Sequence, residues 1–188
     1  MAQRVSYIGE LGWEIYIPSH RAVQVWDALT DAGKEFSLEV GGYKALDSLR
    51  LEKGYRYFTV DITPLENPYE AGLGFCVQMA KGDFIGRDAL LKTKEAGIQQ
   101  KLCTIVLDDQ DYAIIYGGEA IYHNGKVISR VRSGGYGYSL KKNIVYAYLP
   151  LSLAQPGTSL EIEVFDKRME AKVAPTVLID PKGEHLRM

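Results

Sequence analysis

Residues 4–17 read RVSYIGELGWEIYI, two segments rich in apolar residues joined by Gly-Glu-Leu-Gly. Gly9 and Gly12 give the backbone the φ freedom that a tight reversal needs, so the pattern predicts a β-hairpin. In its second strand, period-two alternation places Glu14 and Tyr16 on one face, opposite three apolar side chains. The hairpin is therefore expected to hold a carboxylate beside aromatic rings. That carboxylate is either a ligand contact or an ordinary solvated residue on a half-buried strand.

Composition restricts the function classes. The chain has 188 residues, 46% of them hydrophobic, which suffices for one large globular domain or two small ones. Its 22 basic and 24 acidic residues give a net charge of −2, so no partnership with nucleic acid or an anionic membrane is expected. The apolar runs are too short to span a bilayer, and we expect no membrane association.

Few residues suggest metal or redox chemistry. Cys76 and Cys103 are expected to be lone thiols in a reducing compartment, which favours a cytoplasmic location. His20, His123 and His185 are scattered without the spacing of metal ligands, so no metal site is predicted. The sequence also contains no dinucleotide fingerprint, P-loop or Ser-His-Asp order, and no residue is predicted to be catalytic.

The first half predicts helices packed on an antiparallel sheet. Apolar residues at helical spacing predict helices over 21–32, where Trp26 is expected in the core, and over 43–52 and 87–96. Further strands are expected over 36–40 and 73–79, and an ordered, aromatic-rich loop over 55–71. The expected order is that of an α+β fold.

The second half changes to short strands separated by glycine turns, among them Gly134-Gly135, which indicates a small antiparallel barrel or sandwich. Polar residues after the helix end at Gly97 mark the best boundary, which predicts domains at 1–97 and 98–188. The strands are expected at 102–107, 113–115, 119–123, 126–132, 144–149, 159–165 and 168–173.

Five segments in family order resemble the aminomethyltransferase (glycine-cleavage T-protein) superfamily. More closely, they resemble the folate-binding C-terminal region of dimethylglycine and sarcosine dehydrogenases. The most specific segment is YKALDSLRLEKGYRYFTVDITPLENPYEAGLGF, and the form KGDFIGRDAL with DPKGEHLR favours the dehydrogenase branch. The other segments are RVSYIGELGWEIYIP, SLKKNIVYAYLP and VAPTVLIDPKGEHLR. The resemblance implies the latter part of the T-protein folate-binding core followed by its β-barrel.

The resemblance implies a tetrahydrofolate site to which Tyr7 and Glu14 contribute, since the family places a Tyr and a Glu seven positions apart on this hairpin. Glu14 would accept two parallel hydrogen bonds from the pterin ring. Two positions depart from the pattern of simple T-proteins. Leu46 stands where they carry an Arg, and apolar residues up to Ile179 stand where they carry a Tyr. Those two folate contacts are left unassigned.

Three other residues are expected to have structural roles. Glu10 lies in the turn, and Arg50 and Glu52 are expected to form an ion-pair set, with Arg50 near the cavity as the alternative.

The family's catalytic Asp and the dehydrogenases' FAD domain both precede this hairpin. We therefore expect a C-terminal portion of a longer enzyme that is inactive alone and prone to self-association. In that enzyme, tetrahydrofolate would capture the one-carbon unit of a methylated amine. The alternatives are a non-catalytic folate-binding or regulatory module, and a tetrahydrofolate-dependent demethylase acting on a sulfonium substrate.

Overall fold

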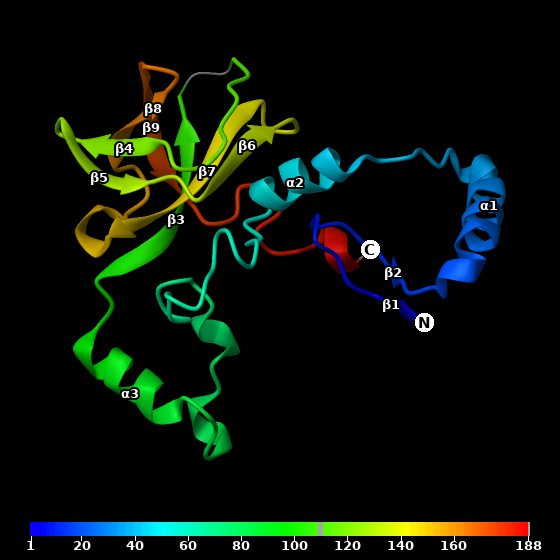
Figure 1. The fold of residues 1–188 in the computed structure, drawn as a ribbon, viewed down its shortest axis with the longest axis horizontal. Helices are drawn as coiled ribbons and strands as arrows, with labels where there is room; N and C mark the ends of the chain where they lie inside the picture. Colours follow the sequence, from blue (N-terminus) through cyan, green and yellow to red (C-terminus); the bar gives the residue numbers. More distant parts are fainter. Residues whose placement is uncertain (109–110, 188) are drawn as a thin grey trace.

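The chain forms a curled, barrel-like sheet with two projecting arms. The computed structural model describes residues 1–108 and 111–187. Figure 1 shows the sheet at the upper left, an arm carrying α1 (Ala22–Gly33) on the right and another carrying α3 (Arg87–Ala96) below. The helix α2 (Tyr43–Glu52) lies between the sheet and the α1 arm. The prediction of an α+β fold with a small antiparallel barrel is confirmed, the sheet forming a half-barrel.

The barrel-like sheet has seven antiparallel strands in the order β5-β4-β8-β9-β3-β7-β6. Its two edge strands are consecutive in the chain, separated by Val131 and Arg132. The backbone N–H of Arg132 donates to the carbonyl of Tyr146 in β7. The short segment between β5 and β6 therefore connects the two edges of the sheet. This connection curls the sheet. The strands are β3 (Gln100–Leu107), β4 (Ala120–His123), β5 (Lys126–Arg130), β6 (Ser133–Gly137), β7 (Lys142–Pro150), β8 (Ser159–Val164) and β9 (Lys167–Ala174).

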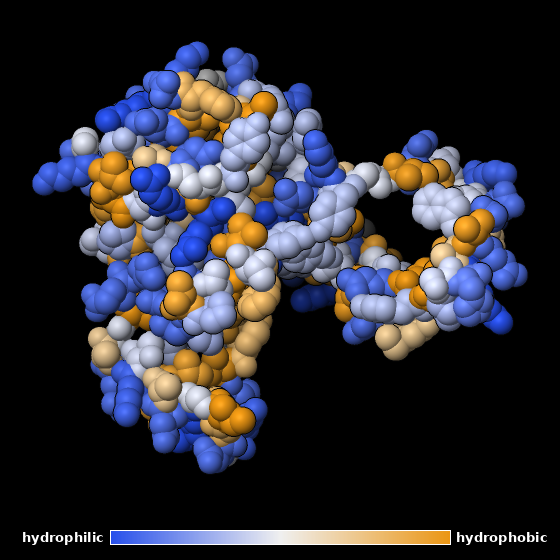
Figure 2. Space-filling view, in the orientation of Figure 1, coloured by the Kyte–Doolittle hydropathy of each residue, from blue (hydrophilic) through white to orange (hydrophobic). Residues whose placement is uncertain are grey.

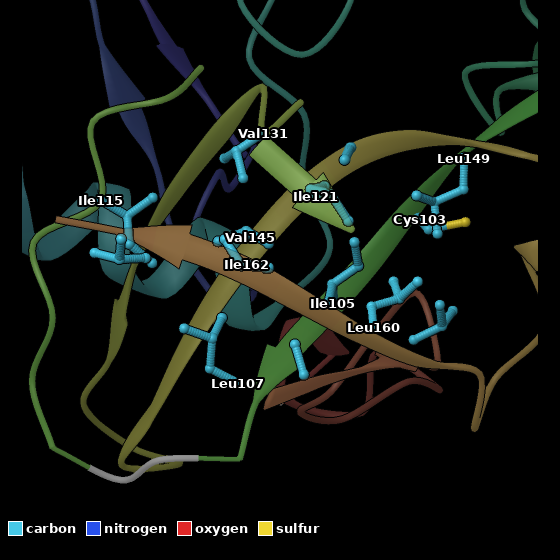
Figure 3. Close-up of a cluster of buried hydrophobic side chains, with 14 of the residues drawn as sticks. Cys103, Ile105, Leu107, Ile115, Ile121, Val131, Val145, Leu149, Leu160 and Ile162 are labelled. Carbon is cyan, nitrogen blue, oxygen red and sulfur yellow. The ribbon is translucent and has the colours of Figure 1, made fainter. Parts of the chain in front are cut away.

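The main core lies inside this curl, as Figure 3 shows. Alternate residues of each strand point inward, so that Ile105 of β3 lies opposite Val145 of β7. Burial of each large aliphatic side chain contributes about 1.5–3 kcal/mol, which makes this cluster the main source of stability. Its labelled members are Cys103, Ile105, Leu107, Ile115, Ile121, Val131, Val145, Leu149, Leu160 and Ile162.

The other face of β7 packs against α2. Ile144, Tyr146 and Tyr148 of β7 form a second buried cluster with Leu51 of α2 and Leu102 of β3. The buried face of α2 consists of Ser48, Arg50, Leu51 and Glu52. The helix bounds agree with the sequence prediction. The apolar residues that recur along this helix, Tyr43, Leu46 and Leu49, do not form its buried face, since Tyr43 is 70% exposed and the two leucines are half-buried.

The glycines predicted as a turn at 134–135 form strand β6 instead. A Cβ on Gly135 would lie 3.1 Å from Leu51 Cδ1, and one on Gly137 would lie 2.8 Å from Glu52 Oε1. Three of the five residues of β6 are glycines, and this lets α2 pack directly on the backbone of the strand. This close approach sets which face of α2 is buried.

The hairpin is shorter and paired differently than predicted. Only β1 (Ala2–Gln3) and β2 (Glu14–Ile15) form a ladder, with Gln3 opposite Glu14. Residues 4–8 are irregular because Ser6 Oγ accepts hydrogen bonds from the N–H groups of Ile8 and Gly9. Such local side-chain bonds compete with a strand ladder.

Three other predicted strands, over 36–40, 73–79 and 113–115, are irregular or 3₁₀ turns. A strand needs a second strand to hydrogen-bond its backbone N–H and C=O groups. Among the described residues, no strand pairs with these three segments. The N–H of Ala113, for example, donates to the side chain of Asn143 at 3.0 Å. The 3₁₀ turns are η1 (Ser19–Arg21), η2 (Lys34–Phe36), η3 (Gly74–Cys76), η4 (Met79–Lys81), η5 (Leu151–Leu153) and η6 (His185–Arg187).

The helix α1 is present as predicted, but its apolar residues are not in the core. Trp26 is 54% exposed and Val23 73%, and no residue of α1 is buried. Figure 2 shows apolar residues on the surface of the arm that carries α1. In residues 1–108 and 111–187, no helix has both the length and the hydrophobicity that a membrane span requires.

Candidate functional site

Tyr7 is held half-buried between the hairpin and the loop that follows α2. Its hydroxyl donates to the carbonyl of Arg56 at 2.8 Å. One face of its ring stacks on Tyr55 at 5.8 Å between centroids, and Tyr57 meets it edge-on at 6.2 Å. Burial raises the pKa of Tyr7, with the Arg50 guanidinium acting in the opposite direction. Tyr7 therefore remains a neutral phenol, with the lone pairs of its oxygen available as acceptors.

Glu14 lies on β2 with its side chain exposed. The hydroxyl of Tyr16 donates to Glu14 Oε2 at 2.7 Å, as expected for two residues on the same face of a strand. This bond raises the pKa of Tyr16. Tyr7 and Glu14 thus share one hairpin but have separate sets of contacts.

A buried network of charged side chains, centred on Arg50 and Asp61, lies next to Tyr57. Arg50, 2% exposed, donates from Nη1 to Asp61 Oδ2 at 2.6 Å and from Nε to Asp47 Oδ1 at 2.7 Å. Asp61, fully buried, also accepts from the N–H of Tyr57 and from Ser133 Oγ. Burial alone would lower the pKa of Arg50, but the two carboxylates outweigh it and raise that pKa. The network anchors the aromatic-rich loop to α2 and β6.

The expected pairing of Arg50 with Glu52 is wrong. Glu52 points to the other side of α2, where its Oε1 accepts from the N–H groups of Ser139 and Leu140 at 2.8 and 3.1 Å. Asp61 was the residue that sequence reasoning missed. A single carboxylate between Val60 and Ile62 was the available signal, since a charge in an apolar segment needs a buried partner.

The end of the chain returns to the hairpin. Lys53 Nζ donates to Asp180 Oδ2 and to the Asp180 carbonyl, both at 2.7 Å. Glu10, expected to be structural, has its Oε1 3.0 Å from His185 Nδ1. These contacts bridge residues 127 and 175 positions apart, so no local pattern could reveal them.

The two positions that depart from the T-protein pattern are both half-buried. Leu46 lies on α2. The N–H of Ile179 donates to the Glu52 carbonyl at 3.2 Å, which keeps this segment against the end of α2. Neither side chain can supply the polar contact that Arg or Tyr would make.

The hollows of the surface lie mainly on the barrel. One of about 620 Å³ is bordered by β5 and β7, and a small cavity of about 40 Å³ lies behind the hairpin turn, lined by Gly9, Leu49 and Lys53 among others. Neither is lined by Tyr7 or Glu14. Both cysteines are free thiols, as predicted, and burial raises the pKa of Cys103 to about 11. The described residues include no group of three or more His, Cys, Asp or Glu side chains that could hold a metal ion.

Comparison with protein families finds two matches. Residues 1–81 match the GCVT N-terminal domain, and residues 100–180 match the glycine cleavage T-protein C-terminal barrel domain. The crystal structure of the glycine cleavage system aminomethyltransferase T from Bartonella henselae superposes with a TM-score of 0.83 at 30% identity, covering 94% of this chain and 49% of that one.

Two curated relatives are similar over nearly the whole chain. 4-Methylaminobutanoate oxidase (formaldehyde-forming) of Paenarthrobacter nicotinovorans is 41% identical over 185 residues, which is 98% of this chain and 22% of that protein. Mitochondrial dimethylglycine dehydrogenase of Homo sapiens is 38% identical over 191 residues, covering 99% and 22%. The chain thus spans about a fifth of the length of these relatives.

Proposed function

Because the chain belongs to the aminomethyltransferase (glycine-cleavage T-protein) superfamily, we propose that it forms part of a tetrahydrofolate site that receives a one-carbon unit from a methylated amine. The observation that carries this proposal is the hairpin. It holds Tyr7 half-buried and Glu14 exposed, seven positions apart, on an element that contacts the loop after α2 and the end of the chain.

The hydrogen-bond acceptors of the hairpin fit the flat ring of tetrahydrofolate, which carries N–H donors. Glu14, whose Oε2 already accepts from Tyr16, is oriented by that bond and can accept from the amino group and ring N–H of a pterin in bidentate geometry. Tyr7 offers an acceptor oxygen and the ring face opposite Tyr55. When bound, tetrahydrofolate would supply the nitrogen that accepts the one-carbon unit.

The role of this chain in such a transfer is orientation. Fixing the plane of a bound ring lowers the entropic part of the barrier by several kcal/mol without any covalent step by the protein. Proton transfer is assigned to no residue here. Residues 1–97 would form the latter part of the folate-binding core, and residues 98–188 the C-terminal barrel domain.

Calorimetric titration of tetrahydrofolate under anaerobic conditions tests the proposal. A hydrogen bond to a charged group contributes about 1.5–3 kcal/mol, so Glu14→Gln should weaken binding by roughly tenfold or more. Glu39→Gln removes an exposed carboxylate outside the hairpin and should leave the affinity unchanged. Equal affinity of wild type and Glu14→Gln would contradict the assignment, as would absence of binding by the wild type.

A second candidate follows from the name of one relative. The Paenarthrobacter oxidase is described as formaldehyde-forming. If this chain is part of an enzyme with the same reaction, the one-carbon unit leaves as formaldehyde, and the hairpin need not bind tetrahydrofolate. Formaldehyde release from a methylated amine that is unchanged by added tetrahydrofolate would favour this candidate.

A further inference from the structure

The turn of the hairpin rests directly on the side chain of Lys53, the residue that follows α2. A Cβ added to Gly9 would lie 2.5 Å from Lys53 Cδ and 2.6 Å from Cγ. Gly9 also has a φ of +84°, which other residues rarely adopt. The position of the Lys53 stem therefore limits where the turn can lie.

The ammonium group of Lys53 is fixed in turn by Asp180. Both side chains are 8% exposed, and Nζ donates to the carboxylate and to the carbonyl of Asp180 at 2.7 Å each. The Asp180 carboxylate also accepts from the N–H groups of Glu184 and His185 at 2.8 and 3.2 Å. One carboxylate thus organises both the lysine and the final turn of the chain.

That final turn holds the hairpin from a second side. His185 Nδ1 lies 3.0 Å from Glu10 Oε1, and Arg4 Nη2 donates to the carbonyl of Leu186 at 3.1 Å. Along the chain, Gly9 thus lies between Arg4 and Glu10, which both contact the final turn that Asp180 holds.

We propose that the Lys53–Asp180 ion pair is a positioning pair for the hairpin that carries Tyr7 and Glu14. The inference rests on the proposed folate function and adds the residues that set the geometry of that site. Gly9 follows Tyr7 by two residues, and strand β2, which carries Glu14, begins after the same turn. A shift of the Lys53 stem therefore displaces Tyr7 and Glu14 together. Removing one partner of a buried pair leaves the other charge without compensation, so the final turn and the hairpin should loosen together.

Hydrogen exchange provides the first test, and it requires no ligand. Lys53→Met keeps an unbranched stem beneath Gly9 while removing the charge, and Asp180→Asn removes the opposite charge with little change in shape. Both variants should speed amide exchange in residues 4–17 by roughly tenfold or more, with exchange in β3 and β7 unchanged. The matched control is Lys172→Met, since Lys172 pairs with Asp108 at the same 2.7 Å on the surface of the barrel. Unchanged exchange in residues 4–17 in both test variants overturns the inference.

Tetrahydrofolate affinity provides the second test, measured for Lys53→Met with and without Glu14→Gln. A positioning pair acts through Glu14, so Lys53→Met should weaken binding by about tenfold in the wild-type background and by much less in the Glu14→Gln background. A loss of the same size in both backgrounds indicates general destabilisation and overturns the inference. If the wild type binds no tetrahydrofolate, the proposed function is wrong, and so is the part of this inference that concerns folate. The exchange experiment then still decides whether the pair orders the hairpin.

Discussion

Replacement of Asp61 by Ala should cause a large loss of stability, because Asp61 is the centre of the buried network. The side chain is fully buried and accepts from Arg50 Nη1, the N–H of Tyr57 and Ser133 Oγ. Truncation would leave the guanidinium of Arg50, itself 2% exposed, with Asp47 as its remaining carboxylate partner.

The expected magnitude follows from these contacts. Breaking a buried ion pair by removing one partner costs about 3–5 kcal/mol. The total stability of a typical domain is about 5–15 kcal/mol, so the loss would be a large fraction of it. Asp61→Asn keeps an acceptor for part of the network and should lose less than Asp61→Ala. The double variant Asp61→Ala/Arg50→Met should also be more stable than Asp61→Ala alone, because it removes the uncompensated charge.

Urea unfolding followed by far-UV circular dichroism measures these differences as shifts of the midpoint at constant slope. Asp31→Asn is the matched control, since Asp31 pairs with Lys34 at 2.7 Å while both side chains are more than 70% exposed. It should change the free energy of unfolding by less than about 0.5 kcal/mol. If Asp61→Ala shifts the midpoint no more than Asp31→Asn does, the argument that burial makes this pair essential is refuted.

Two further predictions concern acid stability and association. The bond to Lys53 and the N–H groups of Glu184 and His185 lower the pKa of Asp180 to about 2, below its value of about 3.9 in an unfolded chain. Its stabilising contribution is therefore present above about pH 4 and is lost as the pH falls toward 2. The unfolding midpoints of wild type and Asp180→Asn should converge over that interval, and a constant difference would contradict the assignment. The exposed Trp26 and Val23 on α1 should cause self-association that depends on concentration. Light scattering should show a lower mass for Val23→Lys/Trp26→Lys, and a wild type that stays monomeric at all concentrations would count against this prediction.

Local sequence patterns determined the helices and most of the barrel. The bounds of α2 and α3 agree with the predicted spans because helical hydrogen bonds form within one segment and end at nearby glycines. Strands β7 and β8 were found because alternating or continuous β-branched and aromatic residues mark a buried strand wherever its partner lies. Period-two alternation placed Glu14 on the polar face of the hairpin but left its role open, and family resemblance added Tyr7 and the expected folate contact.

Tertiary structure decided which apolar segments became strands and which charges were buried. Segments 36–40 and 73–79 have strand-like composition but form no ladder, whereas the glycine-rich β6 pairs along β7 and allows α2 to approach closely. The pairing of Arg50 with Asp61 and of Lys53 with Asp180 joins elements that meet only in the folded chain. Strand pairing and charge burial depend on distant partners, and for that reason a single sequence could predict the elements of this protein but not the contacts that position its hairpin.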